Sequence, residues 1–452
     1  MELTKQKNNT STLDRMFKLT ENGTNVKTEI IAGITTFMTM AYILIVNPSI
    51  LSSTGMDFGA LFTATALSAV VATLVMALYA NLPFALAPAM GPNAFFAFTV
   101  VKSMGYSWEL ALTAVFLEGI IFILLTFVNV REAIINAIPL VLKKAVSVGI
   151  GLFIAFLGLF NAGIVVTGMF HMGDGKLDGV PVALGHITSG PALLAVIGLI
   201  ITSCLLAKNV KGALLLGILS TTIIGIPMGV TQLPEGLNFI SAPPSLTPIF
   251  FKFDFSDIFS LKMLTVLFTF LFVDMFDTVG TLVGVATKAN MLDEEGKVPR
   301  AKEALFADAV GTTFGAILGT STVTTFVESA SGVADGGRTG LTALSTACMF
   351  ALALFLSPLF IMIPQAATAP ALILVGLFMM SPIKEINFDD FTESIPVFLT
   401  IIMMPLTYSI SEGIIFGILS FVILKLATGK QKELSPLMYV ISLLFIIKMI
   451  VG

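Results

Sequence analysis

The segment TSTVTTFVESASG, residues 320–332, places one carboxylate, Glu328, where the character of the sequence changes. Residues before the acid are mostly β-branched or aromatic, which favours extended chain, whereas Ser329 and Ser331 are typical of a helix start. Glu328 is therefore expected at the junction of an extended segment and a half-helix that continues to Gly340. A carboxylate there can accept hydrogen bonds from ligand N–H groups. It can also carry a proton where burial and a neighbouring carboxylate disfavour its ionised form.

A second pair of acids, Asp274 and Asp277, lies within the apolar stretch FLFVDMFDTVGTLVGVATKA. Their spacing, continued by Thr278, puts these polar side chains on one face of a helix. Because a charge near the bilayer centre costs roughly 2.5 to 3.5 kcal/mol, two aspartates in one span indicate a function in binding or proton transfer. A packing role stays open, more so for Asp277 than for Asp274. Four other acids lack such a break in the chain and are interpreted as structural or interfacial: Glu118, Asp308, Asp335 and Glu412.

The composition is that of a polytopic membrane protein, because 56% of the 452 residues are hydrophobic and only 12% are charged. The mean hydropathy is +0.98, and apolar stretches of about 17 to 25 residues recur along the whole chain. This leaves no room for a soluble catalytic domain between them. Cys204 and Cys348 both lie within apolar stretches, so the sequence predicts neither a disulfide nor a metal site.

Fourteen membrane spans are predicted, seven in each half, which makes the fold an all-α bundle. An odd number of spans gives the two halves opposite orientations, and such inverted repeats are a transporter architecture. With the N-terminus in the cytoplasm, eighteen of the 24 lysines and arginines fall on the inner side of the cell membrane, as cytoplasmic loops require. The predicted divisions are an N-terminal segment, the first repeat, an outer loop with an interfacial helix, the second repeat and a C-terminal segment, at 1–28, 29–229, 230–262, 263–428 and 429–452.

The third span of each half, numbers three and ten, is interrupted by a short extended segment. In LPFALAPAMGPNAFFAFTVV, residues 82–101, three prolines indicate extended chain from 83 to 92, since proline lacks an amide donor. Asn93 then becomes the N-cap of a half-helix. Extended segments that meet within a membrane can satisfy part of each other's hydrogen bonding and leave two half-helix N-termini facing a central site. Kinks that serve only helix packing are the alternative.

Five motifs together resemble the AzgA-like purine permeases, a branch of the nucleobase–cation symporters related to uracil and xanthine permeases. In chain order they are AGITTFMTMAYILIVNP, APAMGPNAFFAF, FVDMFDTVGTL, TTFVESASGVADGGRTG and MMPLTYSISEGI. The resemblance covers residues 29–428. It implies a core domain of spans one to four and eight to eleven, and a gate domain of spans five to seven and twelve to fourteen.

The resemblance also implies roles for individual residues. Acids on spans eight and ten hold the nucleobase in this family, and they correspond to Asp274 and Glu328. An aspartate stands in span eight where the uracil branch has a glutamate, and the shorter side chain favours a larger, bicyclic base. Relatives of this kind also suggest a homodimer. The family's second aspartate in span eight corresponds to Asp277. Its Gly-Pro-Asn element in span three corresponds to Gly91, Pro92 and Asn93.

These observations predict a secondary active transporter that imports a purine nucleobase with a proton, without another cofactor and without a nucleic-acid partner. Guanine and hypoxanthine are the preferred predicted substrates, and adenine is a further one. The proton is assigned to Glu328, Asp274 and Asp277, while Gly91, Pro92 and Thr278 shape the site. The predicted contacts to the base, with stacking by the two phenylalanines, are Asp274, Glu328, Asn93, Phe95, Phe326 and Ser329.

Two other classes of protein were weighed against this prediction. One is an anion transporter of the sulfate type on the same architecture, which three acids in the site disfavour. The other is a membrane-embedded enzyme. The sequence offers no metal cluster or nucleophile with an adjacent base, and both histidines, His171 and His186, fall in an outer loop.

Overall fold

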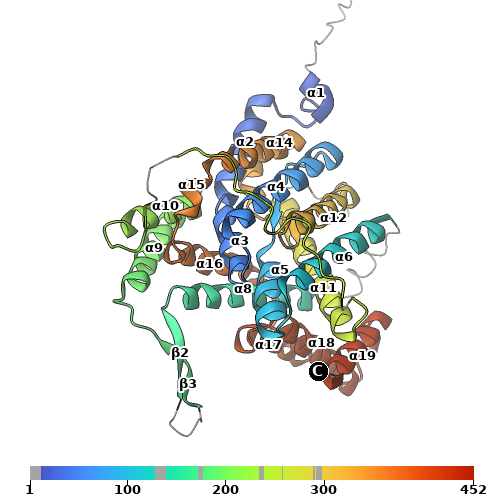
Figure 1. The fold of residues 1–452 in the computed structure, drawn as a ribbon. Helices are drawn as coiled ribbons and strands as arrows, with labels where there is room; N and C mark the ends of the chain where they lie inside the picture. The colour runs from blue at the N-terminus through green and yellow to red at the C-terminus, as the bar shows by residue number, and fades with distance from the viewer. Residues whose placement is uncertain are drawn as a thin grey trace, which may run out of the picture.

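The computed structural model describes residues 12–127, 139–171, 177–233, 239–256, 258–288, 291 and 298–451. The predicted segments 1–28 and 230–262 are therefore covered only in part. Helices dominate the molecule (Figure 1), and short strands at residues 86–88 and 323–325 interrupt them. After α1 (Thr12–Phe17), the elements fall into two series that follow the two predicted halves.

The first half runs from α2 to α10 and begins with a helix that is broken once. Residues 41 and 42 form a turn between α2 (Val26–Met40) and α3 (Ile43–Ser52), which the sequence did not indicate. The remaining elements are α4 (Phe58–Val75) with the π-helical η1 (Met76–Ala80), β1 (Leu86–Pro88), α5 (Met90–Ala94) with the π-helical η2 (Phe95–Ser103), α6 (Trp108–Phe127), α8 (Leu140–Asn161), the strands β2 (Val165–His171) and β3 (Leu177–Leu184), α9 (Gly190–Ala207) and α10 (Ala213–Gly225).

The second half repeats this order, with a strand again third. Its elements are α11 (Leu261–Lys288), α12 (Ala301–Leu318), β4 (Val323–Thr325) with α13 (Ser329–Ala334), α14 (Gly340–Ala353) with η3 (Leu354–Leu356) and α15 (Ser357–Ile361), α16 (Gln365–Met379) with η4 (Ser381–Glu385), α17 (Phe391–Leu406) and α18 (Ile410–Ala427). After η5 (Gln431–Glu433), the C-terminal α19 (Pro436–Val451) follows.

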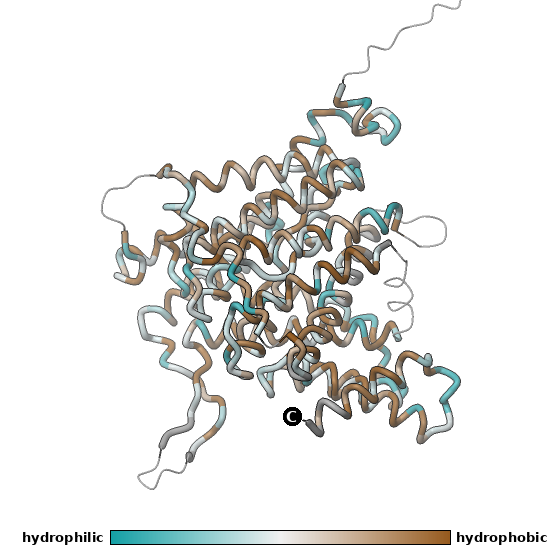
Figure 2. The backbone as a smooth tube through the Cα atoms, turned by 45° about the vertical axis from the view of Figure 1, so that its right-hand side comes forward, coloured by the Kyte–Doolittle hydropathy of each residue, from teal (hydrophilic) through white to brown (hydrophobic). Residues whose placement is uncertain are grey.

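Helix lengths and hydropathy fit a membrane environment. Among the described residues, eight helical stretches are long and apolar enough to cross a membrane, and further apolar helices of 10–17 residues accompany them. Apolar residues cover most of the helical tube, and polar residues gather at helix ends and loops (Figure 2). The chain is thus a multi-pass membrane protein.

Helix packing divides the molecule into two groups. The helices α2 to α6 pack with α11 to α14, while α8, α9 and α10 pack with α16, α17 and α18. Each group therefore draws on both halves of the sequence. This division corresponds to the core and gate that the family resemblance implies.

The strands β1 and β4 pair in antiparallel fashion across the two halves. The register joins Leu86 to Thr325, Ala87 to Thr324 and Pro88 to Val323. Two further backbone bonds extend the ladder, from Ala89 N to Thr322 O at 2.9 Å and from Phe326 N to Ala85 O at 3.0 Å. The prediction that two extended segments meet and satisfy each other's backbone groups is confirmed.

The outward edge of each strand is closed by a threonine from the second element of its own half. Thr73 of α4 donates to Leu86 O at 3.1 Å and accepts from Leu86 N at 3.0 Å. Thr312 of α12 makes the same two bonds with Val323, both at 3.1 Å. Both threonines are fully buried. Corresponding elements thus perform the same task in each half, as an inverted repeat requires.

Three predicted helix ends differ from those observed. The first half-helix begins at Met90 with Ala89 as its N-cap, so Asn93 is not the cap. Pro92 is tolerated because an amide in the first turn has no intrahelical partner. In the second half Glu328, not a serine, is the N-cap, and α13 ends at Ala334 before Gly336, whose φ of +100° stops the helix.

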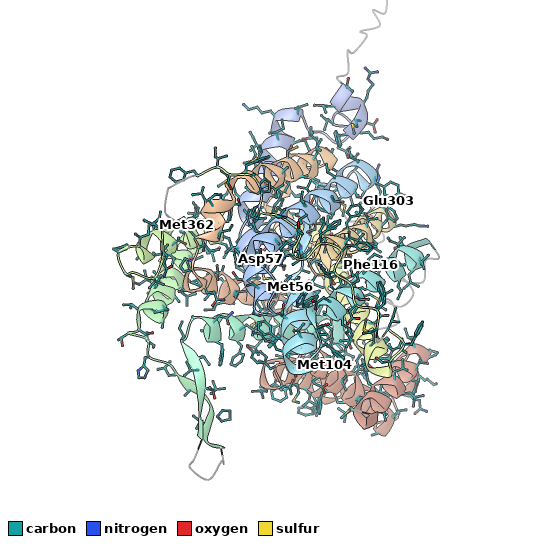
Figure 3. The ribbon with its side chains drawn as sticks, viewed as in Figure 1. Met56, Asp57, Met104, Phe116, Glu303 and Met362 are labelled. Carbon is teal, nitrogen blue, oxygen red and sulfur yellow. The ribbon has the colours of Figure 1, made fainter. Side chains whose placement is uncertain are left out.

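One long loop between helices also differs from expectation. The interfacial helix predicted within 230–262 is absent from described residues 239–256, which form turns and irregular loop structure. Prolines at 243, 244 and 248 interrupt the helical pattern, and Phe253 packs instead on Phe116 of α6, with ring centroids 4.8 Å apart. Phe116 is labelled in Figure 3. The earlier loop forms the β2–β3 hairpin, which extends away from the helices (Figure 1).

Removing either threonine hydroxyl should destabilise the core. Thr73→Val and Thr312→Val each leave a buried N–H and C=O without their partner, so we expect each to lower the free energy of unfolding by about 1 to 3 kcal/mol. Denaturation of the purified protein in detergent measures this. Thr312→Ser, which keeps the hydroxyl, and Thr407→Val on the exposed end of α17 serve as controls. Equal stability of all four variants would show that the hydrogen bonds of Thr73 and Thr312 to the strands contribute nothing to the free energy of unfolding.

Candidate functional site

The acids of α11 lie beside the paired strands. Asp274 is fully buried, and Thr278, one turn later, is 1% exposed. The hydroxyl of Thr278 lies 3.0 Å from Asp274 Oδ1, 3.0 Å from Asp308 Oδ2 of α12 and 2.8 Å from the hydroxyl of Thr324 on β4. One hydroxyl therefore joins two helices and a strand.

This geometry constrains the protonation of the two aspartates. A hydroxyl has a single proton, so Thr278 can donate to only one of the two carboxylates at a time. If both were ionised, the other carboxylate would face the lone pairs of Thr278. A proton on one carboxylate removes this conflict, because that acid can then donate to Thr278.

Asp308 is a site residue that the sequence interpretation missed. It was grouped with the structural acids because α12 carries no break. A signal was present, since Asp308 and Thr312 are four residues apart on one helix face, and Thr312 clamps the strand. Both side chains are fully buried.

Glu328 lies at the start of α13, as predicted, and is partly buried. Tyr42, at the turn between α2 and α3, donates its hydroxyl to Glu328 Oε1 at 2.6 Å. The backbone carbonyl of Glu328 lies 3.5 Å from the hydroxyl of Thr39. Tyr42 was not among the predicted site residues, although it lies within the first family-like motif.

Asp277 joins these acids electrostatically. Its carboxylate interacts with those of Asp308 and Glu328, and its side chain is partly buried. Four carboxylates from α11, α12 and the start of α13 thus gather where β4 ends. Within the described part of the chain, no group of three or more histidine, cysteine, aspartate or glutamate residues is arranged to hold a metal ion.

Asn93 belongs to a separate buried network. Its amide nitrogen donates to Asn47 Oδ1 at 2.6 Å, and its amide oxygen accepts from Ser321. Asn47 in turn donates to Thr65 at 2.7 Å and to Thr320 at 2.9 Å. The amide of Asn93 therefore ties α3 and α5 to the chain that leads into β4. Its predicted contact with the base stays a prediction.

The other predicted residues surround the strands. Phe95 is fully buried and packs edge-to-face on Phe270, one turn before Asp274, with centroids 4.7 Å apart. Phe326 is buried and continues the ladder through its backbone. The hydroxyl of Ser329 accepts a hydrogen bond from Ala85 N at 3.0 Å. It therefore holds the extended segment that leads into β1.

The Gly-Pro element faces the second helix group. A side-chain carbon at Gly91 would lie 3.3 Å from Ile150 of α8. Gly91 therefore permits α5 to approach α8 closely, and Pro92 follows in the first turn of α5. This position is consistent with the predicted role in shaping the site.

Several known proteins of related sequence are permeases. The model of the xanthine/uracil permease family matches residues 27–416. The adenine permease AdeP of Escherichia coli is 44% identical over 97% of this chain and 96% of its own length. The guanine/hypoxanthine permease PbuG of Bacillus subtilis is 46% identical over 95% of this chain and 98% of its own length.

A solved structure shares the fold at much lower identity. The transmembrane domain of the cyanobacterial bicarbonate transporter BicA superposes with a TM-score of 0.62 at 16% identity. The match covers 87% of this chain and 97% of that domain. It shows a common fold.

Asn93→Ala should destabilise the protein more than the loss of a helix cap. An N-cap contributes about 1 kcal/mol, whereas this change removes the buried partner of the Asn47 amide oxygen and of the Ser321 hydroxyl. We therefore expect a loss of about 2 kcal/mol or more in the free energy of unfolding. Asn22→Ala, at an exposed asparagine, is the matched control. A loss no larger than that of the control would contradict the network.

Proposed function

The chain belongs to the xanthine/uracil permease family, and we propose that it imports purine nucleobases by proton symport with alternating access. The observation that carries the proposal is the meeting of Asp274, Asp277, Asp308 and Glu328 beside the paired strands. Carboxylates accept hydrogen bonds from ring N–H and exocyclic amino groups of a base. Like charges this close also disfavour full ionisation, which suits a site that binds and releases protons.

Guanine and hypoxanthine are the proposed main substrates, and adenine is the further candidate. Relatives of nearly equal identity include both an adenine permease and a guanine/hypoxanthine permease, so overall similarity does not separate them. The two kinds of base differ in the donors and acceptors at positions 1 and 6 of the ring. Uptake of labelled hypoxanthine in competition with guanine, adenine, xanthine and uracil distinguishes them.

An anion transporter on this architecture is the alternative function. The fold is shared with a bicarbonate transporter, but an anion site requires positive potential. Four carboxylates in one place oppose an anionic substrate and favour a neutral base. The residues of the site therefore support the purine.

We extend the proposal to the placement of the chain in the membrane. Fourteen spans with a cytoplasmic N-terminus agree with the distribution of lysine and arginine. In this orientation an ion pair joins the two helix groups on the inner side. Lys211, between α9 and α10, donates to both carboxylate oxygens of Asp335 after α13, with 2.6 Å to Oδ1. Alternating access requires such contacts to break and re-form as the groups move.

Asp274→Ala and Glu328→Ala should abolish purine uptake while leaving membrane insertion intact, because removing a charge eases insertion. Uptake of labelled hypoxanthine into cells, normalised to the amount of protein in the membrane, measures the effect. Glu303→Ala, which removes a carboxylate from the first turn of α12, is the matched control. Near-normal uptake by a well-expressed Glu328→Ala protein would remove the central assignment.

The proton is tested separately through the driving force. A neutral base carries no charge, so symport should move net positive charge inward, collapse with a protonophore and rise as external pH falls from about 8 to 6. Glu328→Gln cannot take up a proton and should retain exchange of base but lose accumulation against a gradient. Uptake that ignores pH and protonophore but needs sodium would assign the carboxylates to a metal cation instead.

A further inference from the structure

The contact between Tyr42 and Glu328 has the geometry of a strong hydrogen bond. Its length of 2.6 Å falls in the range of charge-assisted bonds from a hydroxyl to a carboxylate. Tyr42 is 1% exposed, whereas Glu328 is only partly buried. The phenol therefore contacts the carboxylate from within the protein.

Close packing holds the two residues in this relation. α2 lies directly on α13, since a side-chain carbon at Gly332 would lie 2.2 Å from the hydroxyl of Thr36 and 2.5 Å from Ala32 O. Thr35 donates to Asp335 at 2.7 Å at the other end of α13. The turn at residues 41 and 42 then directs Tyr42 towards the first residue of the half-helix. The contact depends on packing between the two halves of the chain.

We infer that Tyr42 is the positioning residue for Glu328: its hydroxyl holds the carboxylate in one orientation toward the base and sets the pH at which Glu328 loads its proton. This inference rests on the proposed function. The hydroxyl stabilises ionised Glu328 more than protonated Glu328, because hydrogen bonds to charged groups are stronger. Without it, Glu328 would keep its proton to a higher pH and would bind the base in a less defined orientation.

Other charged groups around α13 have partners or act from α11. Asp277 of α11 supplies a neighbouring negative charge. Glu29 of α2 accepts from Thr339 and Thr342. After α13, the guanidinium of Arg338 donates to the carbonyls of residues 333 and 337, and Lys211 engages Asp335. Tyr42 is a neutral titratable group that contacts the carboxylate of Glu328 directly.

The experiment compares Tyr42→Phe with Tyr79→Phe, which removes the same atom from an exposed tyrosine of η1. Hypoxanthine uptake into proteoliposomes is measured at fixed internal pH over a range of external pH. For Tyr42→Phe we expect the KM to rise about 10-fold and the decline of uptake with rising pH to move up by about one pH unit. Tyr79→Phe should behave as wild type.

Two further variants separate positioning from a general structural role. In the Glu328→Gln background, Tyr42→Phe should change the affinity measured by exchange less than two-fold, since the charged acceptor is gone. Replacement of Tyr42 by difluorotyrosine, a stronger donor of the same shape, should move the pH profile in the opposite direction. This variant keeps the inference testable if Tyr42→Phe folds poorly.

The outcomes distinguish this inference from the proposed function. A wild-type pH profile and KM in Tyr42→Phe, or an equal loss in both backgrounds, would overturn the role of Tyr42 and leave the acids in place. Normal transport by Glu328→Ala would overturn the proposed site itself, whatever Tyr42 does.

Discussion

The need to satisfy every backbone amide and carbonyl within an apolar surrounding shapes the centre of this protein. Two segments leave the helical conformation there, and each would expose several unpaired groups. Pairing of β1 with β4 satisfies the inner edges, and the hydroxyls of Thr73 and Thr312 satisfy the outer ones. Because the partner of each strand comes from the other half, the two halves must interlock. The helices α2, α4, α11 and α12 are positioned by that interlocking.

The same pairing assembles the acids. Thr324 of β4 contacts Thr278, and Glu328, three residues after the end of β4, contacts Tyr42. Asp308 reaches the cluster because α12 lies against β4 through Thr312. The strand pairing that satisfies the backbone therefore also brings together carboxylates from several elements, which no single helix could do.

Sequence patterns predicted the features that depend on local chemistry. Proline at 83, 88 and 92 and the β-branched run before Glu328 indicated both extended segments, and the polar stripe of α11 indicated Asp274. Features that depend on which helices become neighbours were missed. The sequence around Asp308 and Tyr42 does not say which residues they contact, and helix packing brings them to Thr278 and Glu328. Asn93 was placed in a cap because the first turn was expected after Pro92, whereas the helix begins at Met90.

The separation of the two strands along the chain affects how the protein is made. β1 ends at Pro88 and β4 begins at Val323, so 323 − 88, or 235, residues must be synthesised before the ladder can form. At about 5 to 20 residues per second, this interval lasts on the order of 10 to 50 seconds. During that time the backbone of β1 has Thr73 as its hydrogen-bond partner among the described residues of its own half. The hydrophobic helices on either side of β1 can enter the bilayer. The unpaired backbone N–H and C=O groups of β1 must stay in contact with water or with the insertion machinery until β4 is made. We therefore expect a polypeptide truncated before β4 to be degraded by membrane quality control.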